Sequence, residues 1–119
     1  MNIDYVYEMF IERVKIAIPS EQVNNPIRSL SIFLQDKLCL ELQIKEEEHF
    51  ESPDVSIFTS SVLFKSAFSE ETIAIFSHRG RKYSRNRATV LAIRRLNEDK
   101  ELLTRYANNA FREIHQFIV

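Results

Sequence analysis

The sequence predicts one α+β domain over residues 1–119. Along the chain, an N-terminal helix is followed by an antiparallel sheet and then by two C-terminal helices. Three observations indicate this class. Apolar residues recur with helical spacing near both ends of the chain, they alternate with polar residues in the middle, and the connections between the predicted strands are short. Of the 119 residues, 45% are hydrophobic, which is enough for one core. The expected order is α-β-β-β-β-α-α: a four-stranded, mostly antiparallel sheet with the helices packed on one face.

Residues 3–18 are predicted to form the first helix. At about 100° per residue, its apolar side chains gather on one side; they are Ile3, Val6, Tyr7, Phe10, Val14, Ala17 and Ile18. Asn2 is a suitable N-cap and Pro19 ends the pattern. The Pro- and Asn-rich residues 19–28 that follow are typical of a loop.

Four strands are expected in the centre of the chain. Residues 29–45 predict a β-hairpin with its turn at 35–37, because Leu and Ile alternate with other residues on both sides of that turn. Residues 46–54 predict a charged loop or a frayed strand end. Two further strands are expected in 55–68 and 72–77, although the end of 55–68 also fits a short helix.

The last third of the chain predicts a polar, basic connection followed by two helices. The connection covers residues 78–86, and the first helix runs from about 87 to 97. The second helix, about 99–118, is strongly amphipathic, with Leu, Tyr, Ala, Phe and Ile on one broad face.

Charge is distributed unevenly along the chain. Residues 1–60 contain five Lys/Arg and eleven Asp/Glu, whereas residues 61–119 contain eleven and six, so the two halves carry −6 and +5. The total of −1 is therefore a cancellation. Such asymmetry points to interaction surfaces rather than to a fold.

The first candidate surface is the acidic segment, residues 46–54. Its candidate binding residues are Glu46, Glu47, Glu48, Phe50, Glu51 and Asp54. Complementary charge raises the association rate of a protein complex, and an aromatic anchor supplies affinity. This segment favours a non-enzymatic protein-binding function, most specifically an immunity- or antitoxin-like inhibitor of a basic, nuclease-type toxin. The alternative is a solvated charged loop without a partner.

The second candidate surface is the basic segment, residues 78–95. Its candidate RNA-binding residues are Arg79, Arg81, Lys82, Tyr83, Arg85, Arg87, Arg94 and Arg95. Arginine and lysine at this density can follow phosphates, and a tyrosine can stack on a base. Two alternatives remain open at this point: the segment neutralises acidic neighbours within the same protein, or it docks an acidic protein.

The stretch from an apolar strand through this basic segment into a helix has a recognisable pattern. Its matching residues are Arg81, Asn86, Arg87, Ala88, Leu91 and Leu96. Over residues 42–96 the chain resembles the peptide-release domain of class 1 peptide chain release factors. The Gly-Gly-Gln motif of that family would fall at residues 53–55, where this chain has Pro-Asp-Val. The resemblance implies an α+β fold and an RNA-facing basic loop, without peptidyl-tRNA hydrolysis.

Several classes of site are disfavoured by composition. Gly80 is the only glycine, which excludes a glycine-rich phosphate loop, and Cys39 is the only cysteine, which excludes a cysteine zinc site. His78 beside arginines would suit a phosphodiesterase, but no second acid/base group is evident. No cofactor or metal is expected. No apolar run has membrane-spanning length, and no signal-peptide pattern is present, so we expect a cytoplasmic protein without a membrane partner.

Overall fold

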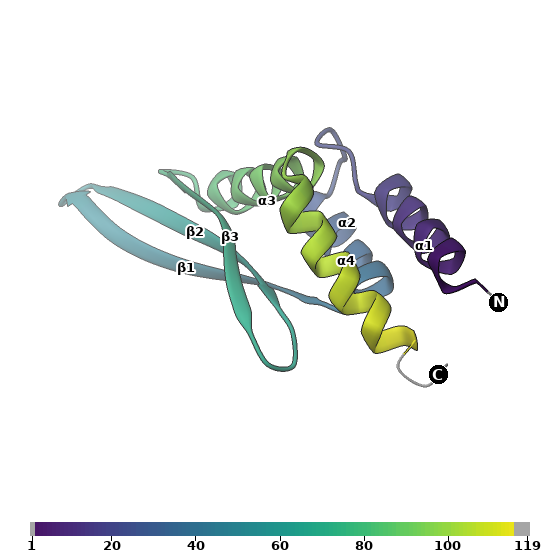
Figure 1. Ribbon diagram of the computed structural model, residues 1–119. Coiled ribbons are helices and arrows are strands. Elements are labelled where there is room, and N and C mark those ends of the chain that lie inside the picture. The colour runs from purple at the N-terminus through teal and green to yellow at the C-terminus, as the bar shows by residue number, and fades with distance from the viewer. Residues whose placement is uncertain (1, 116–119) are drawn as a thin grey trace.

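The computed structural model describes residues 2–115 (Figure 1). Its elements are α1 (Ile3–Ala17), α2 (Pro26–Phe33), the π-helical turn η1 (Leu34–Leu38), β1 (Glu41–Ser52), β2 (Val55–Lys65), β3 (Glu70–His78), α3 (Arg81–Glu98) and α4 (Lys100–His115). The predicted α+β class is confirmed. The predicted strand at 72–77 corresponds to β3, and the final helix begins within one residue of its predicted start. Residues 116–118, which were assigned to the same helix, lie outside the described residues.

The predicted four-stranded sheet is wrong, because residues 2–115 form a sheet of three antiparallel strands in the order β1-β2-β3. The stretch assigned to a fourth strand forms α2 instead. The Asn25 side chain accepts a hydrogen bond from the Arg28 N–H at 3.1 Å, and Pro26 occupies the first turn, so the sequence caps a helix here. Leu30, Phe33 and Leu34 are then buried together at helical spacing.

The predicted hairpin turn at 35–37 is also wrong, because these residues continue from α2 into η1. The chain leaves η1 at Cys39, whose φ of 55° is left-handed, and this residue redirects the backbone into β1. The Leu40 N–H donates to the Leu34 carbonyl at 3.0 Å and holds this junction together. The alternating apolar and polar residues of 29–45 therefore belong to a strand only from Leu42 onward, and the earlier ones belong to α2, η1 and the junction.

The acidic segment is not a loop, and the alternative of a strand end is closer, because the segment forms the outer part of a long β-hairpin. β1 and β2 pair without interruption from Glu41 with Lys65 to Phe50 with Ser56, and the register shifts only between Phe50 and Ser52. We call residues 47–57 the hairpin arm. In Figure 1 the arm projects beyond the helices, and the molecule measures 64 × 29 × 21 Å along its principal axes.

Helix α3 covers one face of the inner part of the sheet. It begins at Arg81 rather than 87, so the predicted basic connection shrinks to Arg79 and Gly80. The reason is Ser84, which is fully buried and hydrogen-bonds the Phe58 and Phe76 carbonyl oxygens at 2.9 and 3.0 Å. Ser84 also contacts the Ser60 hydroxyl at 2.9 Å. These bonds fix the first turn of α3 on β2 and β3.

Helix α4 links the sheet to α1. Tyr106 of α4 packs edge-on against Phe64 of β2, with ring centroids 5.7 Å apart. Further along α4, Phe111 packs edge-on against Tyr7 of α1 at 5.2 Å. One connected core therefore runs from α1 through α2, α3 and α4 to the inner part of the sheet.

Candidate functional site

The predicted acidic and basic segments meet where α3 begins. Glu46 of β1 accepts a hydrogen bond from Arg81 Nε at 2.7 Å and one from Arg85 Nη1 at 2.5 Å. Only 15% of the Glu46 side chain is exposed, although both arginines reach the surface. One carboxylate therefore bridges the first two turns of α3 to the edge strand.

This bridge keeps Glu46 ionised. The hydrogen bond from Arg85 has the largest effect and lowers the pKa of Glu46. Burial opposes it, and the hydrogen bond from Arg81 lowers the pKa again, so the net shift is downward. The alternative in which the basic segment neutralises acidic neighbours of the same protein thus holds for Glu46, Arg81 and Arg85. Sequence reasoning had assigned these residues to two separate surfaces.

The other acidic candidates lie on the hairpin arm and are exposed; they are Glu47, Glu48, Glu51 and Asp54. Glu48 accepts a hydrogen bond from the Ser56 hydroxyl at 2.9 Å, and Glu51 lies 3.8 Å from Arg79, which is a loose ion pair. Phe50 faces the same side of the sheet as Glu48, and 67% of its surface is exposed. The arm therefore combines one large aromatic side chain with a surplus of negative charge.

Beside the arm, the basic segment carries a small aromatic cluster. His78 packs on Tyr83 with ring centroids 4.4 Å apart and stacks on Phe76 at 6.4 Å. The His78 Nδ1 accepts the Gly80 N–H at 2.9 Å, so in the neutral ring the proton resides on Nε2. Tyr83, Arg79 and Lys82 are exposed around this cluster. These groups can stack on a base and contact phosphate.

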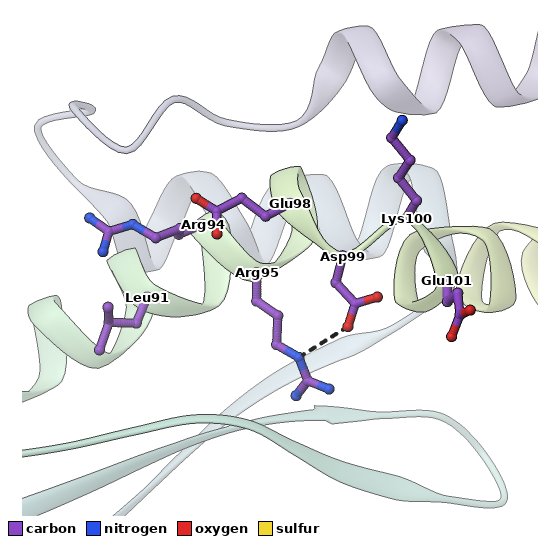
Figure 2. Close-up of a pocket in the computed structure, with 7 residues that line it drawn as sticks. All are labelled: Leu91, Arg94, Arg95, Glu98, Asp99, Lys100 and Glu101. Atoms are coloured by element: carbon purple, nitrogen blue, oxygen red, sulfur yellow. Dashed lines mark ion pairs between the residues drawn. The ribbon is translucent and has the colours of Figure 1, made fainter.

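The remaining basic candidates belong to a different region. Arg94 forms an ion pair with Glu21 at 2.7 Å, which holds the loop before α2 on α3. Arg95 donates to the Ile73 carbonyl at 3.1 Å and faces Asp99 at 3.6 Å. Figure 2 shows both arginines at the hollow between α3 and α4, a space of about 580 Å³. The predicted continuous basic surface is thus divided, and Arg87 lies between its parts, partly buried.

One cluster of charged residues was not predicted from the sequence. Glu71 of β3 accepts hydrogen bonds from Arg105 at 2.9 Å and from the Tyr106 hydroxyl. Burial opposes the charge on Glu71, but the hydrogen bonds from Tyr106 and Arg105 outweigh it, so its pKa is lowered. Burial and Glu71 raise the pKa of Tyr106. Helical spacing placed Tyr106 and Arg105 on α4, but it carried no signal that Glu71 lies opposite them.

Cys39 lines a cavity of about 690 Å³ between η1, the β2–β3 turn and α4. Burial, followed by the charge of Glu113, raises the pKa of the Cys39 thiol, so the thiol form is favoured over the nucleophilic thiolate. Among residues 2–115, no three His, Cys, Asp or Glu side chains are arranged to hold a metal ion. None of the helices described here has both the length and the apolar content needed to cross a membrane.

Comparison of the chain with protein-family models, with curated proteins and with solved structures gives no significant match.

Proposed function

We propose that this is a non-enzymatic binding protein whose hairpin arm docks on a basic protein, most specifically as an immunity- or antitoxin-like inhibitor of a nuclease-type toxin. The observation that carries the proposal is the exposed Phe50 on a projecting, acidic arm. An aromatic side chain at the centre of an interface is a typical source of binding energy. Carboxylates around it steer a basic partner and raise the association rate.

Not every acidic residue of the segment is available to such a partner. Glu46 is excluded, because it holds α3 on the sheet and its side chain is mostly covered. The binding residues of the proposal are therefore Glu47, Glu48, Phe50, Glu51 and Asp54. Because β1 and β2 pair along the arm, the backbone that carries Glu47, Glu48 and Phe50 is ordered before binding, which reduces the entropy lost on association.

The test is affinity purification from the source organism with the protein as bait, with and without nuclease treatment. The variant E47K/E48K/D54K reverses three charges on the arm and leaves Glu46 in place. Its matched control, E98K/E101K/E113K, makes the same change in net charge on α3 and α4, away from the arm. We expect the wild type and the control to retain a basic protein both with and without nuclease treatment. The arm variant should no longer retain it.

Two outcomes contradict the proposal. In one, the arm variant and the control retain the same basic protein equally well. In the other, nuclease treatment removes every specific partner, which would assign binding to a nucleic acid.

A second candidate function, RNA binding, is favoured by one observation. The exposed Tyr83 lies against His78, with Arg79 and Lys82 exposed around it. Stacking on such a tyrosine contributes about 1–3 kcal/mol per base. The variant R79A/K82A/Y83A leaves the Glu46 bridge intact and tests this candidate by fluorescence anisotropy on labelled single-stranded RNA.

Under RNA binding, the wild-type affinity falls steeply as salt rises. Loss of two phosphate contacts would lower the slope of log K against log salt by about 1.4. A wild-type protein that shows no salt-sensitive RNA binding contradicts this candidate.

A further inference from the structure

Helix α1 has two apolar sides, and the core uses only one of them. Tyr7, Phe10 and Val14 face α4 and the rest of the core. Tyr5, Met9 and Ile16 are exposed large apolar side chains, and 81% of Ile16 is exposed. Three such side chains on one helix are more than scattered surface residues require.

The spacing of the exposed side chains is that of a coiled-coil seam. Tyr5, Met9, Glu12 and Ile16 follow each other at intervals of four, three and four residues, so they form one stripe along α1. Glu12 is exposed within that stripe. A single polar residue in a seam fixes the register of two helices and reduces their affinity. The stripe is therefore suited to another helix of the same spacing.

The charges beside the stripe specify the direction of that helix. Asp4 and Glu8 lie in the first half of α1, whereas Arg13 and Lys15 lie in the second half and outweigh the charge of Glu12 there. An antiparallel second copy of α1 would place the acidic half of each helix beside the basic half of the other. A parallel copy would place like charges side by side. Antiparallel helix dipoles also attract each other.

We propose that α1 mediates an isologous, antiparallel dimer of this chain. Tyr5 packs against Ile16 of the second copy, and Glu8 faces the basic half of the second α1. The two Glu12 residues lie near the two-fold axis and keep the association weak. The dimer is independent of the proposed function, because the hairpin arm takes no part in it.

The position of α1 gives this dimer a consequence for any partner. Figure 1 shows α1 and the tip of the hairpin arm at opposite ends of the molecule. A dimer formed through α1 therefore directs its two arms away from each other. One dimer engages two partners at once, and the apparent affinity for a clustered partner rises through effective concentration.

Sedimentation velocity over a wide concentration range tests the dimer. We expect the wild type to change from monomer to dimer as the protein concentration rises into the submillimolar range. Ile16→Glu keeps the protein monomeric, whereas Glu12→Leu shifts the transition to lower concentration because it completes the apolar seam. Both positions are exposed, so circular dichroism should show the same helix content in all three proteins.

A charge exchange separates this arrangement from a nonspecific apolar contact. Glu8→Lys places like charges together twice in each dimer and should weaken association by about tenfold. The double variant E8K/K15E exchanges the two charges and should restore the wild-type affinity. In a Cys39→Ser background, Tyr5→Cys and Ile16→Cys proteins should form a mixed disulfide when combined.

The proposal is overturned if the wild type and Glu12→Leu both remain monomeric at submillimolar concentration. It is also overturned if Ile16→Glu dimerises as well as the wild type does. Self-crosslinking of each cysteine variant without a mixed product overturns the antiparallel arrangement.

Discussion

The β1–β2 hairpin has an inner and an outer half that are built from the same two strands but differ in what covers them. On the face toward α3, the inner half presents Leu42, Ile44, Val62 and Phe64, which pack into the core. On the same face, the outer half presents Glu48, Phe50 and Ser56, which belong to the hairpin arm. The strand pairing continues through both halves.

The inner half therefore contributes to the stability of the fold, whereas the side chains of the outer half are available for binding. Burial of apolar surface under α3 and α4 stabilises the inner half, whereas the outer half is held mainly by its backbone hydrogen bonds. Side chains of the outer half can therefore change with little effect on folding. An aromatic residue kept exposed there stays available for a partner.

The largest expected effect comes from truncating one phenylalanine in each half. Phe64→Ala should lower the free energy of unfolding by about 3–5 kcal/mol, because a side chain that is 1% exposed leaves a cavity under Tyr106. Phe50→Ala should lower it by less than about 0.5 kcal/mol, because Phe50 is exposed. Urea denaturation measures both values. Equal losses would mean that the outer half also supports the core.

A smaller effect is expected from removing one serine hydroxyl that holds α3 on the sheet and one that lies on the hairpin arm. Ser84→Ala removes the group that bonds the Phe58 and Phe76 carbonyl oxygens and should destabilise the fold by about 1–3 kcal/mol. Ser56→Ala removes only an exposed bond to Glu48 and should change stability by less than about 0.5 kcal/mol. Thermal unfolding followed by circular dichroism compares them. If Ser56→Ala destabilised the fold as much as Ser84→Ala, the hairpin arm would not be independent of the core, contrary to the prediction.

The smallest effect concerns the carboxylate at the boundary between the two halves. Glu46→Gln should lower stability at neutral pH by about 0.5–1 kcal/mol, because the ion pairs with Arg81 and Arg85 are partly exposed. The pKa of Glu46 is lower in the folded than in the unfolded chain, so this stabilisation is present above the ordinary glutamate range. It is lost as the pH falls through the folded pKa.

Urea denaturation at neutral and at acidic pH measures this effect. The difference between wild type and Glu46→Gln should narrow in acid. Glu47→Gln is the control on the opposite face of β1, where its exposed carboxylate makes no ion pair among the described residues. A difference that widens in acid would contradict the assigned direction of the pKa.

Helices at the ends of the chain could be predicted from the sequence, but the region 29–38 could not. The spacing of Leu30, Ile32 and Leu34 fits a strand, whereas that of Leu30, Phe33 and Leu34 fits a helix. The cap at Asn25 and the proline at position 26 decide between them. The outer half of β1 was missed for a different reason. Its consecutive glutamates are typical of a loop, and they form a strand because they pair with Ser60, Thr59 and Phe58 of β2.

The candidate residues could be named from the sequence, but their pairings could not. Charge runs identified Glu46, Arg81 and Arg85, yet nothing in the chain indicated that Glu46 lies opposite the start of α3. That contact depends on the register of β1 and on the position of Ser84. Exposure of Phe50 likewise follows from the place where α3 begins rather than from the residues around it.

Glu47 and Glu48 lie next to each other on β1, which is an edge strand of the sheet. An edge strand presents unpaired backbone groups to which a strand from another molecule can add, and such addition leads to aggregation. Consecutive glutamates on that edge repel an identical strand, because pairing two copies would bring their carboxylates together. The same charges that would attract a basic partner thereby keep copies of this protein from polymerising through their sheets.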